Sequence, residues 1–114
     1  MEQIHLTAHF KIHPGKTEAF RELAAQCVEA VRQNEEGALR YQWFYNTDQT
    51  ECKVLETYRD TAAVFAHMQN VGPFLQQLFA ISEVSGDVYG HITEPLRKGF
   101  EGLDISFFEY DTGI

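Results

Sequence analysis

The first residues in this sequence that could do chemistry are three histidines near the N-terminus, His5, His9 and His13. They alternate with apolar residues in the segment QIHLTAHFKIH, residues 3–13. Alternation with a period of two predicts a β-strand, so the three histidines share one face of it together with Thr7. Imidazole can bind a metal ion, and it can also act as a base because it is mostly neutral at pH 7.

The spacing of these histidines argues against a metal site built from them alone. Residues four apart on a strand lie about 13 Å from each other, whereas two ligands of one zinc ion must each come within about 2 Å of it. The sequence has no CxxC motif and no HxxxH motif on a predicted helix. We therefore expect no metal site, and two interpretations of the histidine face remain: a solvated sheet face, or the lining of a pocket.

The composition indicates one globular domain that does not bind nucleic acid or membranes. The chain has 114 residues, of which 44% are hydrophobic, and a formal net charge of −8 at pH 7. An acidic protein without a cluster of Lys and Arg is a poor partner for phosphate backbones and anionic lipids. No basic and apolar leader precedes the first strand, so we expect a cytoplasmic protein. Cys27 and Cys52 are expected to be buried thiols rather than a disulfide.

Two helices are predicted. The first begins near Thr17, which we expect to cap it, and carries apolar residues at i, i+3, i+4, i+7, i+8 and i+11 counted from Phe20. Gly37 is expected to end this region in a left-handed turn. The second helix follows Asp60, an expected N-cap, and is expected to break at Gly72–Pro73 before a further turn or two.

Four strands complete the predicted domain, residues 1–94. After the strand at 4–12, residues 39–45 and 52–58 form a predicted hairpin, and residues 87–93 form the fourth strand. The order strand, helix, strand, strand, helix, strand is the ferredoxin-like α+β arrangement, in which two helices cover one face of a four-stranded antiparallel sheet.

The uncovered face of this sheet is expected to carry His5, Thr7 and His9 from the first strand and Tyr89 and His91 from the fourth. Aromatic and aliphatic residues occur on both faces, and a large apolar face is not expected to stay in water. We therefore expect two sheets to pack face to face in a homodimer, forming a dimeric α/β barrel. The histidine row would then face the cleft between the two subunits.

Residues 95–114 form a predicted C-terminal extension, made of a short helix and a fifth strand. Leu103, Ile105 and Phe107 alternate with residues that point the other way. A four-stranded unit offers only its edges for further pairing, so this strand is expected at an edge of its own sheet or of another subunit's sheet. We expect the extension to contribute a dimer contact.

Two segments resemble the antibiotic biosynthesis monooxygenase family, whose members are dimeric α/β barrels. The segment EEGALRYQWFYN, residues 35–46, is similar to the second strand of the family, and VLETYRDTAAVFAHM, residues 54–68, to its third strand and following helix. The resemblance extends over about residues 3–93. Haem-degrading relatives resemble one another in an asparagine and a tryptophan at the positions of Thr7 and Tyr58, so the resemblance does not favour haem as a ligand.

The resemblance implies a cofactor-independent monooxygenase that oxidises a small aromatic phenol or quinol. A deprotonated phenol can itself reduce dioxygen, and the protein supplies a base, orientation and a dry pocket. His67 matches the helix histidine of the family and is the candidate base that the resemblance implies, whereas His5, His9 and His91 are candidate bases only by their sheet face. Glu56, a carboxylate on a sheet face, needs a partner, which could be His67, Arg40 or Lys53.

Catalytic roles are therefore predicted for His67 and Glu56, with no cofactor. The residues predicted to bind the substrate are His5, Thr7, His9, Tyr58, Phe74, Tyr89 and His91. Two other functions stay open: a non-catalytic small-molecule-binding or regulatory domain, and a small-molecule isomerase or lyase.

Overall fold

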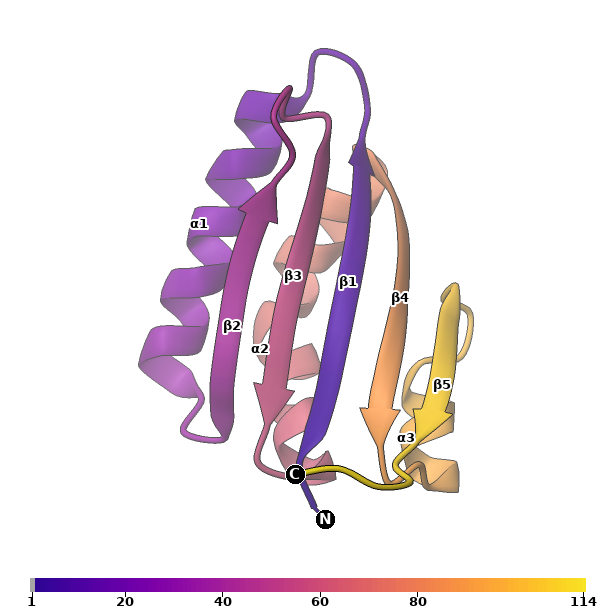
Figure 1. Cartoon of the computed structure of the whole chain (residues 1–114). Helices are drawn as coiled ribbons and strands as arrows, with labels where there is room; N and C mark the ends of the chain where they lie inside the picture. Colours follow the sequence, from indigo (N-terminus) through magenta and orange to yellow (C-terminus); the bar gives the residue numbers. More distant parts are fainter. Residues whose placement is uncertain (1) are drawn as a thin grey trace.

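The computed structural model of the chain describes residues 2–114. A single five-stranded sheet has the strand order β2-β3-β1-β4-β5, and helices α1 and α2 lie behind it on one face (Figure 1). The elements are β1 (Ile4–Ile12), α1 (Thr17–Asn34), β2 (Ala38–Tyr45), β3 (Glu51–Tyr58), α2 (Thr61–Ala80), β4 (Ser82–Gly90), α3 (Glu94–Gly99) and β5 (Ile105–Glu109). The predicted ferredoxin-like α+β fold with an extra C-terminal strand is confirmed.

The strand β1 lies at the centre of the sheet and pairs antiparallel with β3 on one side and β4 on the other. The predicted hairpin of β2 and β3 is also antiparallel. The C-terminal strand β5 runs parallel to β4 of the same chain, with Gly86 opposite Ile105 and Gly90 opposite Glu109. The extension therefore completes the edge of its own sheet.

The predicted alternation along β1 separates two faces as expected. Ile4, Leu6, Phe10 and Ile12 are buried against the helices. Two apolar clusters fill the space between sheet and helices. One is built around Phe10, Phe20 and Leu78, and the other around Ile4, Tyr58 and Leu96. The second cluster includes residues of α3, so the C-terminal extension is part of the core.

Local predictions at the start of α1 and at Gly37 were wrong. Thr17 is the first residue of α1 rather than its cap, and its hydroxyl donates to the carbonyl of Gln49 at 3.3 Å. Gly37 has no left-handed backbone. Its small size serves a close approach instead, because a Cβ on Gly37 would lie 2.6 Å from the Cβ of Ala63. Asp60 caps α2 as predicted and accepts a hydrogen bond from the backbone N–H of Ala63.

The predicted break of the second helix was also wrong, because α2 runs without interruption through Pro73. Proline costs a helix one backbone hydrogen bond, but burial of Val71 and Leu78 on either side holds both halves of α2 against the core. The fourth strand begins earlier than predicted and ends at Gly90, whose φ of 146° suits glycine. His91 consequently lies just beyond the sheet.

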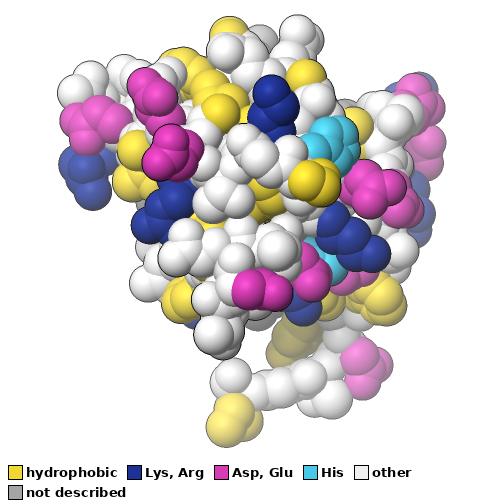
Figure 2. Space-filling model, turned by 90° about the horizontal axis from the view of Figure 1, so that it is seen from above, with side chains coloured by type: hydrophobic (Ala, Val, Ile, Leu, Met, Phe, Trp, Pro, Cys, Tyr) yellow, Lys and Arg dark blue, Asp and Glu magenta, His cyan; other side chains and the backbone are white. Residues whose placement is uncertain are grey.

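Charged side chains of both signs share the described surface (Figure 2). Figure 2 shows Lys and Arg side chains lying among acidic, apolar and neutral ones on the end of the molecule seen from above. Within residues 2–114, none of the helices has the length and apolar character needed to cross a membrane. Cys27 and Cys52 are free buried thiols, as predicted, and burial raises the pKa of each to about 11.

Candidate functional site

A cavity of about 80 Å³ lies between the sheet and α2, on the helix-covered side of the sheet. Its walls are mostly apolar. The sheet contributes Leu6, Ala8, Phe10, Tyr41, Trp43, Val54, Glu56, Tyr58, Val84 and Ser85, and α2 contributes Val64, His67, Met68, Leu75 and Phe79. A mostly apolar cavity with few polar groups is typical of a small-molecule site.

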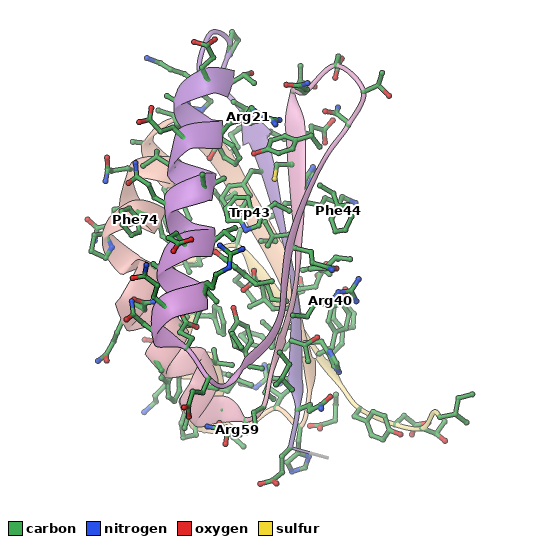
Figure 3. All side chains as sticks on the ribbon, turned by 90° about the vertical axis from the view of Figure 1, so that its left-hand side faces the viewer. Arg21, Arg40, Trp43, Phe44, Arg59 and Phe74 are labelled. Atoms are coloured by element: carbon green, nitrogen blue, oxygen red, sulfur yellow. The ribbon has the colours of Figure 1, made fainter. Side chains whose placement is uncertain are left out.

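The polar part of the wall joins three residues that the sequence predicted. His67 Nε2 lies 3.6 Å from Glu56 Oε1, and the side chains of both residues are less than 9% exposed. The hydroxyl of Tyr58 donates a hydrogen bond to the same Glu56 oxygen. Arg40 points to the opposite side of the sheet (Figure 3), and Lys53 lines a hollow on that side. Of the three partners considered for Glu56, His67 is therefore the one in place.

A second carboxylate, Glu35, holds the other side of the imidazole and was missed by the sequence analysis. Its two oxygens lie 3.0 and 3.2 Å from His67 Nδ1. Asn70 donates to Glu35 Oε2 at 2.7 Å and to the carbonyl of Ala30 at 3.0 Å. His67 thus lies between two buried carboxyl groups, Glu35 and Glu56. Glu35 directly follows the last residue of α1, and an acidic residue at the end of a helix usually faces water.

The close contact at Gly37 explains how α2 reaches Glu35. Ala63, His67 and Asn70 are spaced by four and three residues, so they project from one side of α2. Ala63 packs against Gly37, two residues after Glu35. This contact brings the first turns of α2 against the end of α1, where His67 and Asn70 meet the Glu35 carboxylate.

The two carboxyl groups have opposite tendencies to hold a proton. Burial raises the pKa of Glu56, and the charge of Glu35 adds to this, although His67 and the Tyr58 hydroxyl act in the other direction. Burial also acts to raise the pKa of Glu35, but hydrogen bonds from His67 and Asn70 and the charge of His67 outweigh it and lower this pKa. Compared with an ordinary glutamate, Glu35 therefore holds a proton less readily and Glu56 more readily. Titratable groups with such opposed environments are typical of acid–base sites.

The hydroxyl groups beside Glu56 stay protonated. Burial raises the pKa of Tyr41 and of Tyr58, and the charge of Glu56 raises both further. Tyr58 is therefore a hydrogen-bond donor in the site rather than a base. Trp43 also lines the cavity, and its indole Nε1 is buried without a hydrogen-bond partner among the described residues.

The other predicted site residues lie away from this cavity. His5, Thr7, His9 and Tyr89 are on the uncovered face of the sheet, as expected from the alternation. There His5 hydrogen-bonds with Thr57 at 2.9 Å, His9 with Glu51 at 2.6 Å, and Thr7 with Tyr89 at 3.3 Å. The exposed His91 lies 3.1 Å from Glu109. Phe74 packs on the cluster around Phe20 and lies in the helix layer (Figure 3), outside the cavity lining.

The C-terminal extension forms one wall of the cavity, which the sequence analysis did not foresee. Phe100, Leu103 and Ile105 line it. Phe100 is buried, whereas Leu103, in the segment between α3 and β5, is 43% exposed. The extension therefore closes the cavity on the side of β4. Among residues 2–114, no group of three or more His, Cys, Asp or Glu side chains is arranged to hold a metal ion.

The chain is an α+β domain of ferredoxin-like topology with a cavity between its sheet and its second helix. The sequence profile of the antibiotic biosynthesis monooxygenase family matches residues 3–72. This is more than half of the chain, which therefore belongs to the antibiotic biosynthesis monooxygenase family.

Solved structures support the same fold. MupZ from Pseudomonas fluorescens matches with a TM-score of 0.88 and 23% identity, over 100% of this chain and 94% of that one. Protein SO0527 from Shewanella oneidensis matches with a TM-score of 0.69 and 26% identity, over 77% of this chain and 89% of that one. SnoaB is a cofactor-independent oxygenase from Streptomyces nogalater, and its structure is that of the mutant N63A. It matches with a TM-score of 0.68 and 17% identity, over 83% of this chain and 99% of that one. No curated protein matches the sequence.

Proposed function

We propose that this protein is a cofactor-independent monooxygenase that oxidises a small aromatic phenol or quinol in the cavity. The observation that carries the proposal is the buried row Glu35, His67 and Glu56, which ends at an apolar cavity. The family supports a monooxygenase, and SnoaB is a relative in fold that is described as a cofactor-independent oxygenase.

In the proposed reaction, His67 Nε2 takes the proton of the phenol hydroxyl. The carboxylate of Glu35 at Nδ1 stabilises the imidazolium that forms, as a buried carboxylate does for a catalytic histidine. The phenolate then reduces dioxygen: one oxygen atom enters the ring, and the other leaves as water with two hydrogens from the substrate. The apolar walls exclude water. Glu56, which accepts the hydrogen bond of the Tyr58 hydroxyl, supplies in its protonated form a hydrogen-bond donor for the developing charge.

The size of the cavity limits the substrate. At about 80 Å³ it is smaller than a cavity of about 150 Å³ that binds benzene. A ring can enter only if a wall moves, and Leu103 is a wall residue with an exposed side chain. We expect substrate to enter beside the segment between α3 and β5.

We further propose that the protein forms a homodimer through the uncovered face of the sheet. Phe44 and Phe108 are about half exposed there, and Tyr89 stacks on Phe108 with ring centroids 5.6 Å apart. Figure 3 shows Phe44 on the side away from the helices. The substrate-binding roles of His5, Thr7, His9, Tyr89 and His91 stay predictions that depend on this second subunit.

Oxygen consumption tests the leading function. Purified protein freed of metal and flavin is mixed with a panel of phenols and quinols, and dioxygen uptake and the incorporation of labelled oxygen are measured. We expect uptake with at least one substrate, and a loss of about 100-fold or more in the His67→Ala variant. Absence of uptake across the panel, with ligand binding retained, would favour the non-catalytic binding domain.

The raised pKa of Glu56 supports a second candidate function. A carboxyl group with a raised pKa and an imidazole 3.6 Å from it can donate and accept protons in an isomerase or lyase reaction, which needs no oxygen. Turnover that continues under strictly anaerobic conditions would identify this class, whereas the proposed monooxygenase stops without dioxygen.

A further inference from the structure

We propose that Glu35 forms a proton port, through which the cavity exchanges protons with the hollow at the end of α1 by way of His67 and Glu56. The inference deepens the proposed function, because it rests on proton transfer taking place in the cavity. It assigns a role to Glu35 beyond holding the imidazole in position.

The two sides of His67 face different spaces. On one side is the small cavity, which His67 and Glu56 line and Glu35 does not. On the other side is an open hollow of about 690 Å³ between the end of α1 and the start of α2. Glu35 forms part of this hollow together with Arg32, Arg59 and Ala63. Glu35 therefore lies between His67 and this hollow.

The row of polar atoms between the two spaces is nearly continuous. Glu35 Oε1 lies 3.0 Å from His67 Nδ1, within hydrogen-bond range. His67 Nε2 lies 3.6 Å from Glu56 Oε1, longer than the ~3.2 Å limit of a good hydrogen bond. Proton transfer at this second step needs the two groups to come closer together. The side chains of Glu35 and His67 are only 3% and 8% exposed, so water does not bypass them easily.

The proposed transfer moves one proton and breaks no other bond. A proton from Glu56 or the substrate binds His67 Nε2, the proton on Nδ1 passes to the Glu35 carboxylate, and Glu35 releases it to water in the hollow. The ring is left with its proton on Nε2. Return of a proton along the same row, which the reaction requires when oxygen leaves as water, restores the proton on Nδ1.

A purely structural role for Glu35 is the alternative. Its bonds to His67 and Asn70 tie the end of α1 to α2 and would do so even if no proton moved. The two roles differ in one respect. A glutamine at position 35 can keep hydrogen bonds to both partners but cannot carry a proton from one to the other.

The experiment measures how fast the ring N–H of His67 exchanges with water, by nitrogen-15 NMR of the whole protein without substrate. We expect exchange about 100-fold slower in Glu35→Gln than in the wild type, as for loss of a proton-transfer group. Glu36→Gln is the matched control, because Glu36 borders the same hollow on the next residue and should leave the exchange rate unchanged. If the ring N–H of His67 exchanges at the same rate in Glu35→Gln as in the wild type, whether that rate is fast or slow, the proposed proton port is refuted.

Two further arms keep the test decisive. If Glu35→Gln does not fold, Glu35→Met keeps the length of the side chain but cannot carry a proton, and unchanged exchange in that folded variant also overturns the proposal. With a turned-over substrate, Glu35→Ala should lose about 100-fold in kcat and regain activity with added formate, which enters through the hollow. A wild type without turnover refutes the proposed monooxygenase alone, since the exchange measurement needs no substrate.

Discussion

Gly37 and Ala63 are packed so closely that a Cβ on Gly37 would lie 2.6 Å from the Cβ of Ala63. This contact sets the distance between the end of α1 and the first turns of α2. The carboxylate of Glu35 and the imidazole of His67 come from these two segments. The geometry of the buried polar row therefore depends on a residue that carries no functional group.

Gly37→Ala is expected to lower the free energy of unfolding by about 1–3 kcal/mol, because the added methyl overlaps Ala63 and forces α2 outward. Urea unfolding measures the change. Gly72→Ala is the control, since a Cβ there meets nothing within 4 Å and alanine favours helix, so a gain of about 0.5–1 kcal/mol is expected. Equal stability of Gly37→Ala and the wild type would show that α2 can shift freely.

The fold could be predicted from the sequence because local signals agreed with one another. The period of two along β1, the apolar stripe of α1 and the Asp60 cap each specify an element, and the order of elements specifies the topology. The continuous helix through Pro73 could not be predicted. Burial of Val71 and Leu78 holds it, and burial depends on tertiary packing.

The candidate site could be predicted only in part, for a related reason. Glu56, Tyr58 and His67 are carried by a strand and a helix of predictable direction, and they meet at the cavity. Glu35 follows the last residue of α1, where the local sequence gives no direction for its side chain. The histidines of β1 were correctly placed on one face, but the cavity formed on the other, because the helices cover that side.

Phe100→Ala is expected to enlarge the cavity and to lower the free energy of unfolding by about 3–5 kcal/mol, because Phe100 is a buried wall residue. Chemical unfolding and the affinity for single-ring and two-ring phenols are measured, and the larger ligands should gain most. Phe108→Ala, on the exposed face of β5, removes the same side chain outside the cavity and should leave ligand preference unchanged. Identical ligand preference in both variants would remove the extension from the cavity wall.

The opposite pKa shifts of the two carboxyl groups predict opposite pH dependences of stability. The pKa of Glu56 is raised in the folded state, so its contribution is fully present below the ordinary value of 4.5 and is lost as pH rises through the folded pKa. The pKa of Glu35 is lowered, so its contribution is present above 4.5 and is lost as pH falls through the folded pKa.

Replacing each carboxyl group by an amide isolates these effects. As pH rises above 4.5, the wild type loses the contribution of Glu56, so Glu56→Gln should become more stable relative to it. As pH rises towards 4.5 from below, the wild type gains the contribution of Glu35, so Glu35→Gln should become less stable relative to it. Urea unfolding of the three proteins between about pH 3 and pH 8 measures the differences. Parallel stability curves for both variants would contradict the assignment of proton and charge within the pair.

We expect a homodimer formed through the uncovered face of the sheet, and we expect a single charge introduced on that face to disrupt it. Phe108 is 51% exposed and stacks on Tyr89, so Phe108→Asp would place a charge in the centre of an apolar contact. Sedimentation at micromolar concentration should show a dimer for the wild type and a monomer for the variant. Lys98→Glu, on the exposed side of α3, also lowers the net charge and should remain dimeric. A monomeric wild type would leave the aromatic face unexplained.

The strongest functional prediction concerns His67, and His9 serves as its comparison. Both histidines contact a glutamate, but His67 is buried beside the cavity, whereas His9 pairs with Glu51 on the uncovered face of the sheet. If His67 is the base, His67→Ala lowers turnover by about 100-fold or more and leaves the oligomeric state intact.

A bracing role for His67 predicts a different pattern. The variant would then leave Glu35 and Glu56 without their shared partner, lower the melting temperature, and lose activity only in proportion to the unfolded fraction. His9→Ala should retain wild-type turnover in either case, unless the dimer interface supplies part of the site. Turnover and thermal unfolding are measured for both variants, well below their melting temperatures. Wild-type turnover in folded His67→Ala would remove the helix histidine from the mechanism and direct attention to the strand histidines.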